Sequence, residues 1–196
     1  TLAVTFTNKA AKEMLTRITA MLPINTRGMW IGTFHGLCHR MLRTHHQDAG
    51  LVQTFQILDS ADQLALVKRI LKSLSADDKK FPPRQVQWFI NNAKEAGLRA
   101  AYVVADDAFS RRMLEFYQAY EQQCNKEGAV DFPELLLRSY ELLSHNEILC
   151  KHYQERFSHI LVDEFQDTNP LQYKWLKLLA GAGTQNAAAV FVVGDD

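Results

Sequence analysis

The sequence predicts an α/β protein in which a parallel β-sheet is interrupted by an all-helical insertion. Three short apolar runs with strand character lie near the two ends of the chain, at residues 2–6, 160–162 and 189–193. Between about residue 45 and residue 157 there is no strand signal, only the apolar spacing of amphipathic helices. We therefore expect an α/β domain assembled from both ends of the chain, with the helical stretch inserted into it.

The first part of the chain alternates strand and helix. After the strand at 2–6, Thr7 and Asn8 are good helix N-caps, and Pro23 stops the helix that they begin. The apolar face of this helix is formed by Met14, Ile18, Met21 and Leu22. Trp30-Ile31 is a second brief strand, and Thr33 caps a second helix.

Helix start and stop signals punctuate the middle of the chain. Ser60 and Gln63 form a capping box, and Pro82-Pro83 opens a later helix that Gly97 closes. A second capping box pairs Asp131 with Glu134. Between these helices lies an aromatic stripe that is most simply a core, made of Phe109, Phe116, Tyr117 and Tyr120.

Strand character returns in the last part of the chain. The two late strands flank a helix in which Pro170 takes the first position behind Thr168 or Asn169. Fully apolar strand runs are typical of a parallel sheet covered on both faces. We place the sheet domain at residues 1–32 and 156–196 and the helical insertion at residues 33–155.

The composition is that of an ordinary folded protein. The 196 residues include 22 Lys and Arg against 22 Asp and Glu, so a nucleic-acid site must be a local patch. Three distant cysteines exclude a disulfide framework or zinc ribbon and suit the cytoplasm. No apolar run approaches the roughly 20 residues that a membrane span needs, so we expect no membrane partner.

Two adjacent carboxylates, Asp163 and Glu164, follow the strand at 160–162. The carboxyl ends of parallel strands border the ligand crevice of such sheets. One carboxylate there can hold a hydrated Mg²⁺ bound to nucleotide phosphates, and the next can deprotonate the attacking water. Asp195 and Asp196 end a neighbouring strand and are expected at the same crevice. On the residues alone, the alternative is that Asp163-Glu164 merely caps a loop.

Five strings in the sequence carry a resemblance to a known family. They are TFTNKAAKEM at 5–14, GTFHGLCHR at 32–40, VDFPELLLR at 130–138, VDEFQDTN at 162–169 and VGDD at 193–196. In this order they resemble motif Ia, motif Ib, a further signature, motif II and the start of motif III of the UvrD/PcrA/Rep-type superfamily-one DNA helicases. The resemblance covers essentially the whole chain.

The resemblance implies a motor of two RecA-like P-loop NTPase domains that couples hydrolysis of Mg²⁺-bound ATP to 3′ to 5′ movement on single-stranded DNA. This chain would hold most of the first motor domain, 1A, with the helical subdomain 1B inserted. Asp163 matches the Mg²⁺-associated carboxylate and Glu164 the catalytic base, and Gln166 is assigned with Glu164 to catalysis. Asp195 is expected to contact the nucleotide.

The same resemblance implies DNA contacts at two strand ends. The implied residues are Phe6, Thr7, Asn8, Lys9, Thr33, Phe34 and His35, and we add Arg40 from the dense basic run that follows. An aromatic ring, a hydroxyl, an amide and a lysine before a helix N-terminus offer base stacking together with phosphate donors. Without the family, a core role for Phe6 and a simple cap at Thr7-Asn8 is the plainer interpretation.

Two further patterns are set aside. His35 and His39 are spaced like half of a metal site, but no Glu between them completes H-E-x-x-H. The segment 181–184 looks faintly like a phosphate loop, yet it lacks the G-K-[ST] ending and follows a helix. We expect it to be a helix C-cap and turn.

The sequence departs from the family in one respect. No G-x-x-x-x-G-K-[ST] string occurs, so these residues lack the phosphate-binding loop, and the chain opens on Thr1 inside a strand. We therefore expect a fragment of a longer protein that alone neither hydrolyses ATP nor unwinds DNA. A motor domain without the strand that carries the phosphate-binding loop would also expose strand edges and apolar surface.

Three functional interpretations remain open. The first is an ATP-dependent helicase acting on single-stranded or duplex-junction DNA, with repair proteins as further partners, and the second is the motor of a helicase-nuclease. The third is a non-catalytic single-strand-binding or regulatory module. The intact Asp163-Glu164 pair disfavours the third, because adjacent carboxylates are costly to hold together without a cation.

Overall fold

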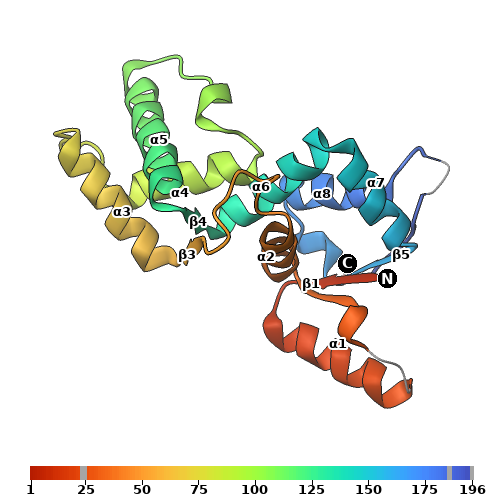
Figure 1. The fold of residues 1–196 in the computed structure, drawn as a ribbon. Helices are drawn as coiled ribbons and strands as arrows, with labels where there is room; N and C mark the ends of the chain where they lie inside the picture. The colour runs from red at the N-terminus through yellow and green to blue at the C-terminus, as the bar shows by residue number, and fades with distance from the viewer. Residues whose placement is uncertain (23–25, 185–186, 195–196) are drawn as a thin grey trace. The chain divides into compact units, whose positions relative to one another are not determined.

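The computed structural model describes residues 1–22, 26–184 and 187–194. Within these ranges it contains eight α-helices and six β-strands, grouped in two compact units (Figure 1). Unit 1 comprises Thr1–His45 and Arg138–Asp196, and unit 2 comprises His46–Leu137. The predicted α/β class is confirmed.

Unit 1 is built on a four-stranded sheet. Its strands are β1 (Leu2–Thr5), β2 (Trp30–Thr33), β5 (His159–Val162) and β6 (Ala189–Val192). Their order is β2-β1-β5-β6, and every neighbouring pair is parallel. The sheet thus joins segments from both ends of the chain, as the sequence predicts.

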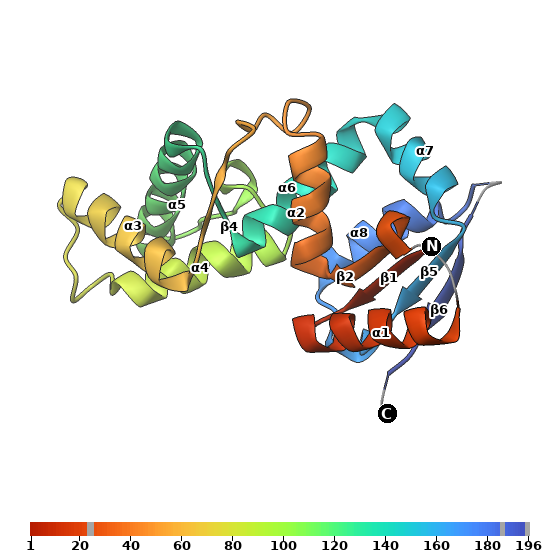
Figure 2. The same ribbon diagram turned by 60° about the horizontal axis from the view of Figure 1, so that its bottom comes forward.

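The two faces of this sheet are covered unequally. Helix α1 (Asn8–Met21) lies on one face, while α2 (Phe34–Thr44), α7 (Glu147–Arg156) and α8 (Pro170–Ala180) lie on the other (Figure 2). Helix α1 buries none of its residues, and Met21 is 79% exposed. Every residue of β6 is exposed, and so is Leu161 of β5. The expectation of a sheet covered on both faces is therefore wrong for β5 and β6.

Helices α2, α7 and α8 form the well-packed side of unit 1. Trp175 of α8 is fully buried, and its Nε1 donates to the Ser139 hydroxyl over 3.0 Å. The ring of Phe34, the first residue of α2, packs edge-on against Trp175 with centroids 6.1 Å apart. Helices α2 and α7 belong to unit 1, whereas the predicted boundaries at 33 and 155 put them in the insertion. The difference arises because helical periodicity does not reveal which core a helix faces.

Unit 2 is mainly helical. It contains α3 (Ser60–Ser73), α4 (Pro83–Glu95), α5 (Ala108–Glu127) and the start of α6 (Phe132–His145). A 3-10 turn in unit 2 spans Ala100–Tyr102. Two more 3-10 turns lie in unit 1, at Thr26–Gly28 and Phe165–Asp167. Two short strands, β3 (Gln56–Leu58) and β4 (Ala129–Asp131), pair in parallel, so the expectation of no strand in this region is wrong. Three-residue strands are too short to show an alternating pattern, and their pairing is a tertiary contact.

The capping boxes predicted in the middle of the chain lie at the starts of α3 and α6. Helix α3 is capped by Asp59, whose carboxylate accepts from the backbone N–H groups of Ala61 and Asp62, so the predicted cap at Ser60 is wrong by one residue. At the start of α6, the backbone N–H of Glu134 donates to Asp131 over 2.8 Å, which supports that capping position.

A buried ion network lies inside unit 2. The ammonium of Lys94, 1% exposed, is 2.7 Å from Asp131 Oδ2 and 3.0 Å from Glu134 Oε2. The Tyr120 hydroxyl also donates to Asp131, and Arg99 donates to Glu134, both over 2.7 Å. Burial lowers the pKa of Lys94, but the Asp131 and Glu134 carboxylates outweigh it and raise that pKa above its usual value. Lys94 is therefore charged at neutral pH.

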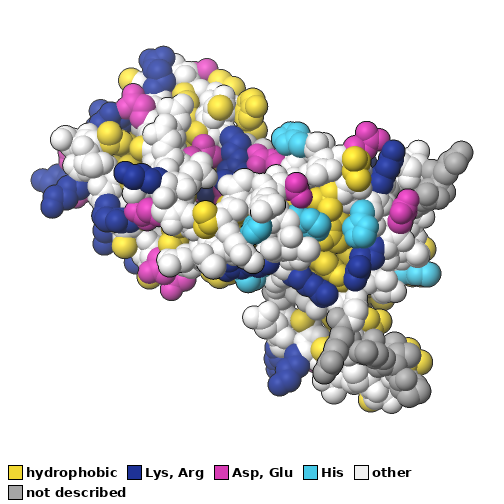
Figure 3. All heavy atoms as spheres, viewed as in Figure 1, with side chains coloured by type: hydrophobic (Ala, Val, Ile, Leu, Met, Phe, Trp, Pro, Cys, Tyr) yellow, Lys and Arg dark blue, Asp and Glu magenta, His cyan; other side chains and the backbone are white. Residues whose placement is uncertain are grey.

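Charge on the visible surface is mixed. In the view of Figure 3, Lys and Arg side chains over unit 2 are interspersed with Asp and Glu side chains. None of the helices in the described ranges is both long and apolar enough to cross a membrane.

Candidate functional site

The carboxyl ends of the strands meet at one edge of the unit 1 sheet. In the β1–β2 pairing Thr5 is opposite Thr33, and in the β1–β5 pairing Val4 is opposite Val162. The residue after β5, Asp163, therefore lies beside Thr5, and its backbone N–H donates to Val4 O over 3.0 Å. The predicted acidic residue and the predicted DNA-contact segments thus share this edge.

Asp163 is held by a side chain that the sequence analysis did not single out. The hydroxyl of Thr5 donates to Asp163 Oδ2 over 3.2 Å. Thr5 is 1% exposed, whereas Asp163 is half-buried. The only signal in the sequence is that Thr5 is the hydroxyl residue at the end of the first strand. Among the described residues no other side chain bonds Asp163, so its carboxylate keeps lone pairs available for a ligand.

Glu164 stands in an unusual backbone conformation. Its φ of 51° and ψ of 48° are left-handed, which costs a residue with a Cβ of order 1–3 kcal/mol. The surrounding turn holds it, because Phe165 N donates to Val193 O over 3.0 Å and Asp167 N donates to Glu164 O over 3.0 Å. The Glu164 carboxylate is exposed at the strand end.

Gln166 connects Glu164 to the end of β6. Its Nε2 donates to Glu164 Oε2 over 2.6 Å. A Cβ placed on Gly194 would lie 2.3 Å from Gln166 Oε1, so a side chain at Gly194 would displace this amide. Asp195, predicted to contact the nucleotide, lies outside the described residues, as does Asp196.

The oxygen-rich edge suits Mg²⁺ held jointly with phosphates. Carboxylate and hydroxyl oxygens are the ligands that this ion prefers, and it usually keeps several waters and substrate oxygens. The described part of the chain contains no group of three or more His, Cys, Asp or Glu that could hold a metal. Asp163 is a carboxylate that could hold a Mg²⁺ ion together with nucleotide oxygens and water.

Helix caps occupy two of the predicted DNA-contact residues. The Thr7 hydroxyl accepts from Ala10 N over 3.1 Å at the start of α1, and the Thr33 hydroxyl accepts from Gly36 N over 3.2 Å at the start of α2. Asn8 and Lys9 are exposed next to Thr7, at the N-terminus of α1. The edge therefore presents two helix N-termini, which favour anions.

The two predicted aromatic contacts differ in exposure. Phe34 is 1% exposed and packs between Phe6, at a centroid distance of 5.4 Å, and Trp175. In this structure its ring is part of the core and is closed to a nucleic-acid base. Phe6 is half-buried, so it is the ring of this pair that reaches solvent.

Arg40 lies away from the strand-end edge. Its guanidinium stacks 4.5 Å from the centroid of the Trp30 ring and donates to Met29 O over 3.0 Å. Because α2 runs back along β2, Arg40 reaches the beginning of that strand, about one and a half helical turns beyond His35. The structure thus does not bring Arg40 together with the other predicted DNA contacts.

His39 of α2 contacts a neighbouring side chain of the same helix. The imidazole of His39 accepts from Arg43 Nε over 2.9 Å. Burial and the Arg43 charge lower the pKa of His39, and burial lowers the pKa of His35. Both rings therefore favour the neutral form.

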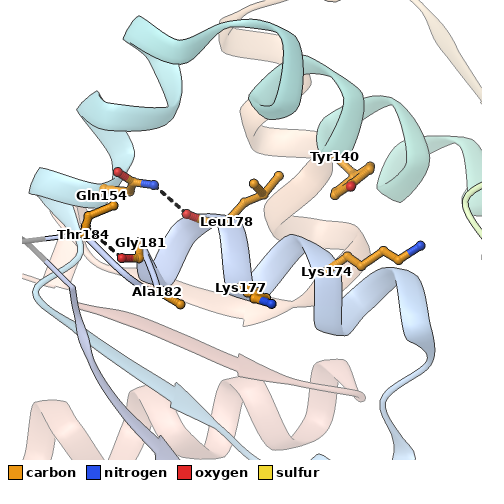
Figure 4. A pocket seen from close by; sticks show the side chains of 8 residues that line it. All are labelled: Tyr140, Gln154, Lys174, Lys177, Leu178, Gly181, Ala182 and Thr184. Atoms are coloured by element: carbon orange, nitrogen blue, oxygen red, sulfur yellow. Dashed lines mark hydrogen bonds between the residues drawn. The ribbon is translucent and has the colours of Figure 1, made fainter.

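A surface hollow of about 330 Å³ is separate from the strand-end edge. Its lining residues come from α6, α7, α8 and the turn after α8 (Figure 4): Tyr140, Gln154, Lys174, Lys177, Leu178, Gly181, Ala182 and Thr184. Gln154 donates to the Leu178 carbonyl over 2.8 Å, and Gly181 caps α8 with a φ of 61°. The segment 181–184 is thus a helix C-cap and turn, as predicted, and none of the strand-end residues lines the hollow.

The fold and its edge define an open parallel-sheet α/β protein in which the predicted ligand-binding side chains follow the strands. The chain belongs to the UvrD/REP helicase family, since all of residues 1–196 match the UvrD/REP helicase N-terminal domain.

Individual relatives agree with this family. The chain is 52% identical over 196 residues to DNA helicase II of Escherichia coli (strain K12), and 53% identical over 200 residues to DNA helicase II of Haemophilus influenzae. It is 39% identical over 197 residues to the ATP-dependent DNA helicase PcrA of Leuconostoc citreum. These alignments cover 99–100% of this chain but only 26–27% of each relative, so the chain spans about a quarter of their length.

Proposed function

We propose that this chain is a segment of an ATP-dependent DNA helicase that moves 3′ to 5′ on single-stranded DNA, and that its sheet is part of a RecA-like motor domain. The relatives carry the names DNA helicase II and ATP-dependent DNA helicase PcrA. The observation that carries the proposal is the Asp163-Glu164 pair at the end of β5, beside the ends of β1 and β6. Roles in DNA repair and a cytoplasmic location follow from the same proposal.

In this proposal the acidic pair divides the work of ATP hydrolysis. Asp163 would hold the Mg²⁺ that accompanies ATP, and that ion would neutralise charge on the phosphates. Glu164 would orient the attacking water and take its proton. Gln166 supports this role because its amide bonds the Glu164 carboxylate and restrains its position. Asp195 stays a proposed nucleotide contact.

The proposed DNA contacts lie on the segments after β1 and β2. Phe6 offers a half-exposed ring for base stacking, and Asn8 and Lys9 offer exposed donors to phosphates. Thr7, Thr33 and His35 stand beside them at the helix N-termini. Phe34 and Arg40 support this surface indirectly, Phe34 by packing under Phe6 and Arg40 by fixing the start of β2.

We further propose that unit 1 corresponds to motor domain 1A and unit 2 to the inserted subdomain 1B. Unit 1 holds the sheet with the acidic pair, and unit 2 has its own buried core of helices α3, α4 and α5. The proposed border then lies near His45 and Arg138.

The test is ATP hydrolysis by the complete protein that contains these residues, with Mg²⁺, with and without single-stranded DNA. Removing a general base costs about 10²- to 10⁴-fold in rate, so Glu164→Gln is expected to abolish measurable turnover. Glu147→Gln, an exposed carboxylate that pairs with Lys151 in α7, is the matched control and is expected to retain it. Unchanged turnover in Glu164→Gln would refute the assignment.

Residues 1–196 alone are expected to show no ATP hydrolysis, because their sequence contains no phosphate-binding loop. A Mg²⁺-dependent rate in this purified segment that Glu164→Gln abolishes would contradict the expectation. Anisotropy of labelled single strands across a salt series measures DNA binding, and no affinity even at low salt would count against the DNA contacts.

A further inference from the structure

We infer that Thr5 is a positioning residue that couples the DNA-contact segment after β1 to the Mg²⁺ carboxylate Asp163. The inference rests on the proposed function, because it assumes that Asp163 serves Mg²⁺-ATP and that the segment after β1 touches DNA. It adds a residue to which none of the roles above is assigned. Its basis is the hydrogen bond from the Thr5 hydroxyl to Asp163 Oδ2.

Two consecutive residues of β1 hold Asp163. Val4 accepts from the Asp163 backbone N–H over 3.0 Å, and Thr5 donates from its side chain to the carboxylate over 3.2 Å. Strand β1 lies between β2 and β5, so both of its edges are paired. The position of the Thr5 hydroxyl is therefore set by the sheet.

Thr5 is also one peptide bond from the proposed DNA contacts. Phe6 follows it directly, and Thr7 anchors the next turn by capping α1. A DNA strand that orders this segment would also restrain the end of β1. Because Thr5 is buried and β-branched, it has few rotamers with which to absorb a shift of its backbone. Such a shift is passed on to Asp163.

The hydrogen bond acts on the orientation of the Asp163 carboxylate. A hydroxyl bound to Oδ2 restrains rotation of the carboxylate and leaves Oδ1 for the hydration shell of Mg²⁺. Side chains that orient a metal-binding group change metal affinity or activity by about 10- to 100-fold when they are removed. Loss of the Thr5 hydroxyl should therefore impair Mg²⁺ use and DNA stimulation, while DNA affinity is retained.

The experiment compares Thr5→Val, which keeps the shape but removes the hydroxyl, with Thr5→Ser, which keeps the hydroxyl. The control is Thr16→Val, because the Thr16 hydroxyl bonds only the backbone of α1, at Lys12 O. ATP hydrolysis by the complete protein is measured over a Mg²⁺ series with and without single-stranded DNA. Anisotropy gives the DNA affinity, and thermal unfolding shows whether each variant is folded.

In Thr5→Val, we expect the Mg²⁺ concentration for half-maximal rate to rise about tenfold and the stimulation by DNA to fall about tenfold. DNA affinity should stay within about twofold, and Thr5→Ser and Thr16→Val should resemble the wild type. If Thr5→Val does not fold, Thr5→Ala replaces it and is interpreted in the same way.

Wild-type Mg²⁺ dependence and stimulation in the folded hydroxyl-free variant would overturn the inference, as would equal losses in Thr5→Ser. A lower melting temperature in Thr5→Val, with the half-maximal Mg²⁺ concentration and the stimulation by DNA both unchanged, would also overturn it, because Thr5 would then be only structural. The proposed function fails separately. If Glu164→Gln keeps its turnover, the ATP site is wrong, whereas a silent Thr5→Val beside an inactive Glu164→Gln refutes the coupling alone.

Discussion

The two units differ in the burial and in the bonding partners of the charged side chains compared below. Unit 2 buries Lys94, Asp131 and Glu134 almost completely and pairs each with an opposite charge. Unit 1 leaves Asp163 half-buried and Glu164 exposed at a strand end, bonded to neutral Thr5 and Gln166. The comparison teaches that charges satisfied within the protein support its structure, whereas carboxylates left with free lone pairs are available to a ligand.

The units also differ in how they bury apolar surface. In unit 2 the three main helices enclose a continuous core that includes Phe116 and Tyr117. In unit 1 one side of the sheet is closed by α2, α7 and α8, while Phe191 of β6 is 57% exposed. The exposed apolar side chains of β6 form the part of this sheet that the described helices leave uncovered.

The largest expected effect comes from breaking the ion network of unit 2. Lys94→Met leaves Asp131 buried without a cation and should lower the free energy of unfolding by about 3–5 kcal/mol. Chemical denaturation of residues 1–196, followed by circular dichroism, measures this loss. Lys126→Met, on α5 at the surface, is the control and should stay within about 0.5 kcal/mol. A loss below about 1 kcal/mol for Lys94→Met would show that the network contributes little.

The next prediction distinguishes the roles of the two aromatic rings at the strand ends, Phe34 and Phe6. Phe34→Ala should lower the free energy of unfolding by about 3–5 kcal/mol, because its ring is buried between Phe6 and Trp175. Phe6→Ala should instead weaken single-strand binding by the complete protein by about 1–3 kcal/mol, because its ring is half-exposed.

Denaturation and fluorescence anisotropy on both variants provide the check. To keep Phe34 variants folded for the binding assay, Phe34→Leu retains most of the buried volume and should bind DNA like the wild type. A folded Phe34→Leu protein that loses affinity as strongly as Phe6→Ala would restore Phe34 as a direct contact.

The sequence predicts the features of this molecule that depend on local patterns of apolar and polar residues. The apolar runs before Asp163 and around Val4 predicted parallel strands, and their carboxyl ends share an edge because a parallel sheet requires it. The Thr5–Asp163 bond escaped prediction because it joins residues 158 positions apart and depends on strand register. The apolar spacing from Phe34 to Leu42 did predict the buried face of α2 that includes Phe34, whereas its role as a DNA contact came from the resemblance alone.

The smallest expected effect is a pH dependence of stability that comes from His39 in α2 of unit 1. Burial and Arg43 lower the pKa of His39 in the folded chain below its usual value of about 6.5. Below that pH the unfolded chain binds more protons than the folded one, so stability is lost as pH falls from 6.5 toward the folded pKa. Protonation would also remove the acceptor that Arg43 Nε uses.

His39→Gln should therefore reduce the loss of stability between about pH 7.5 and pH 5.5. Urea denaturation of residues 1–196 at both pH values measures this loss, and His159→Gln, at an exposed position in β5, is the control. A loss of the same size in His39→Gln and the wild type would show that His39 does not carry this pH dependence. A change of equal size in His159→Gln would assign the effect to histidine content in general instead of to the Arg43 contact.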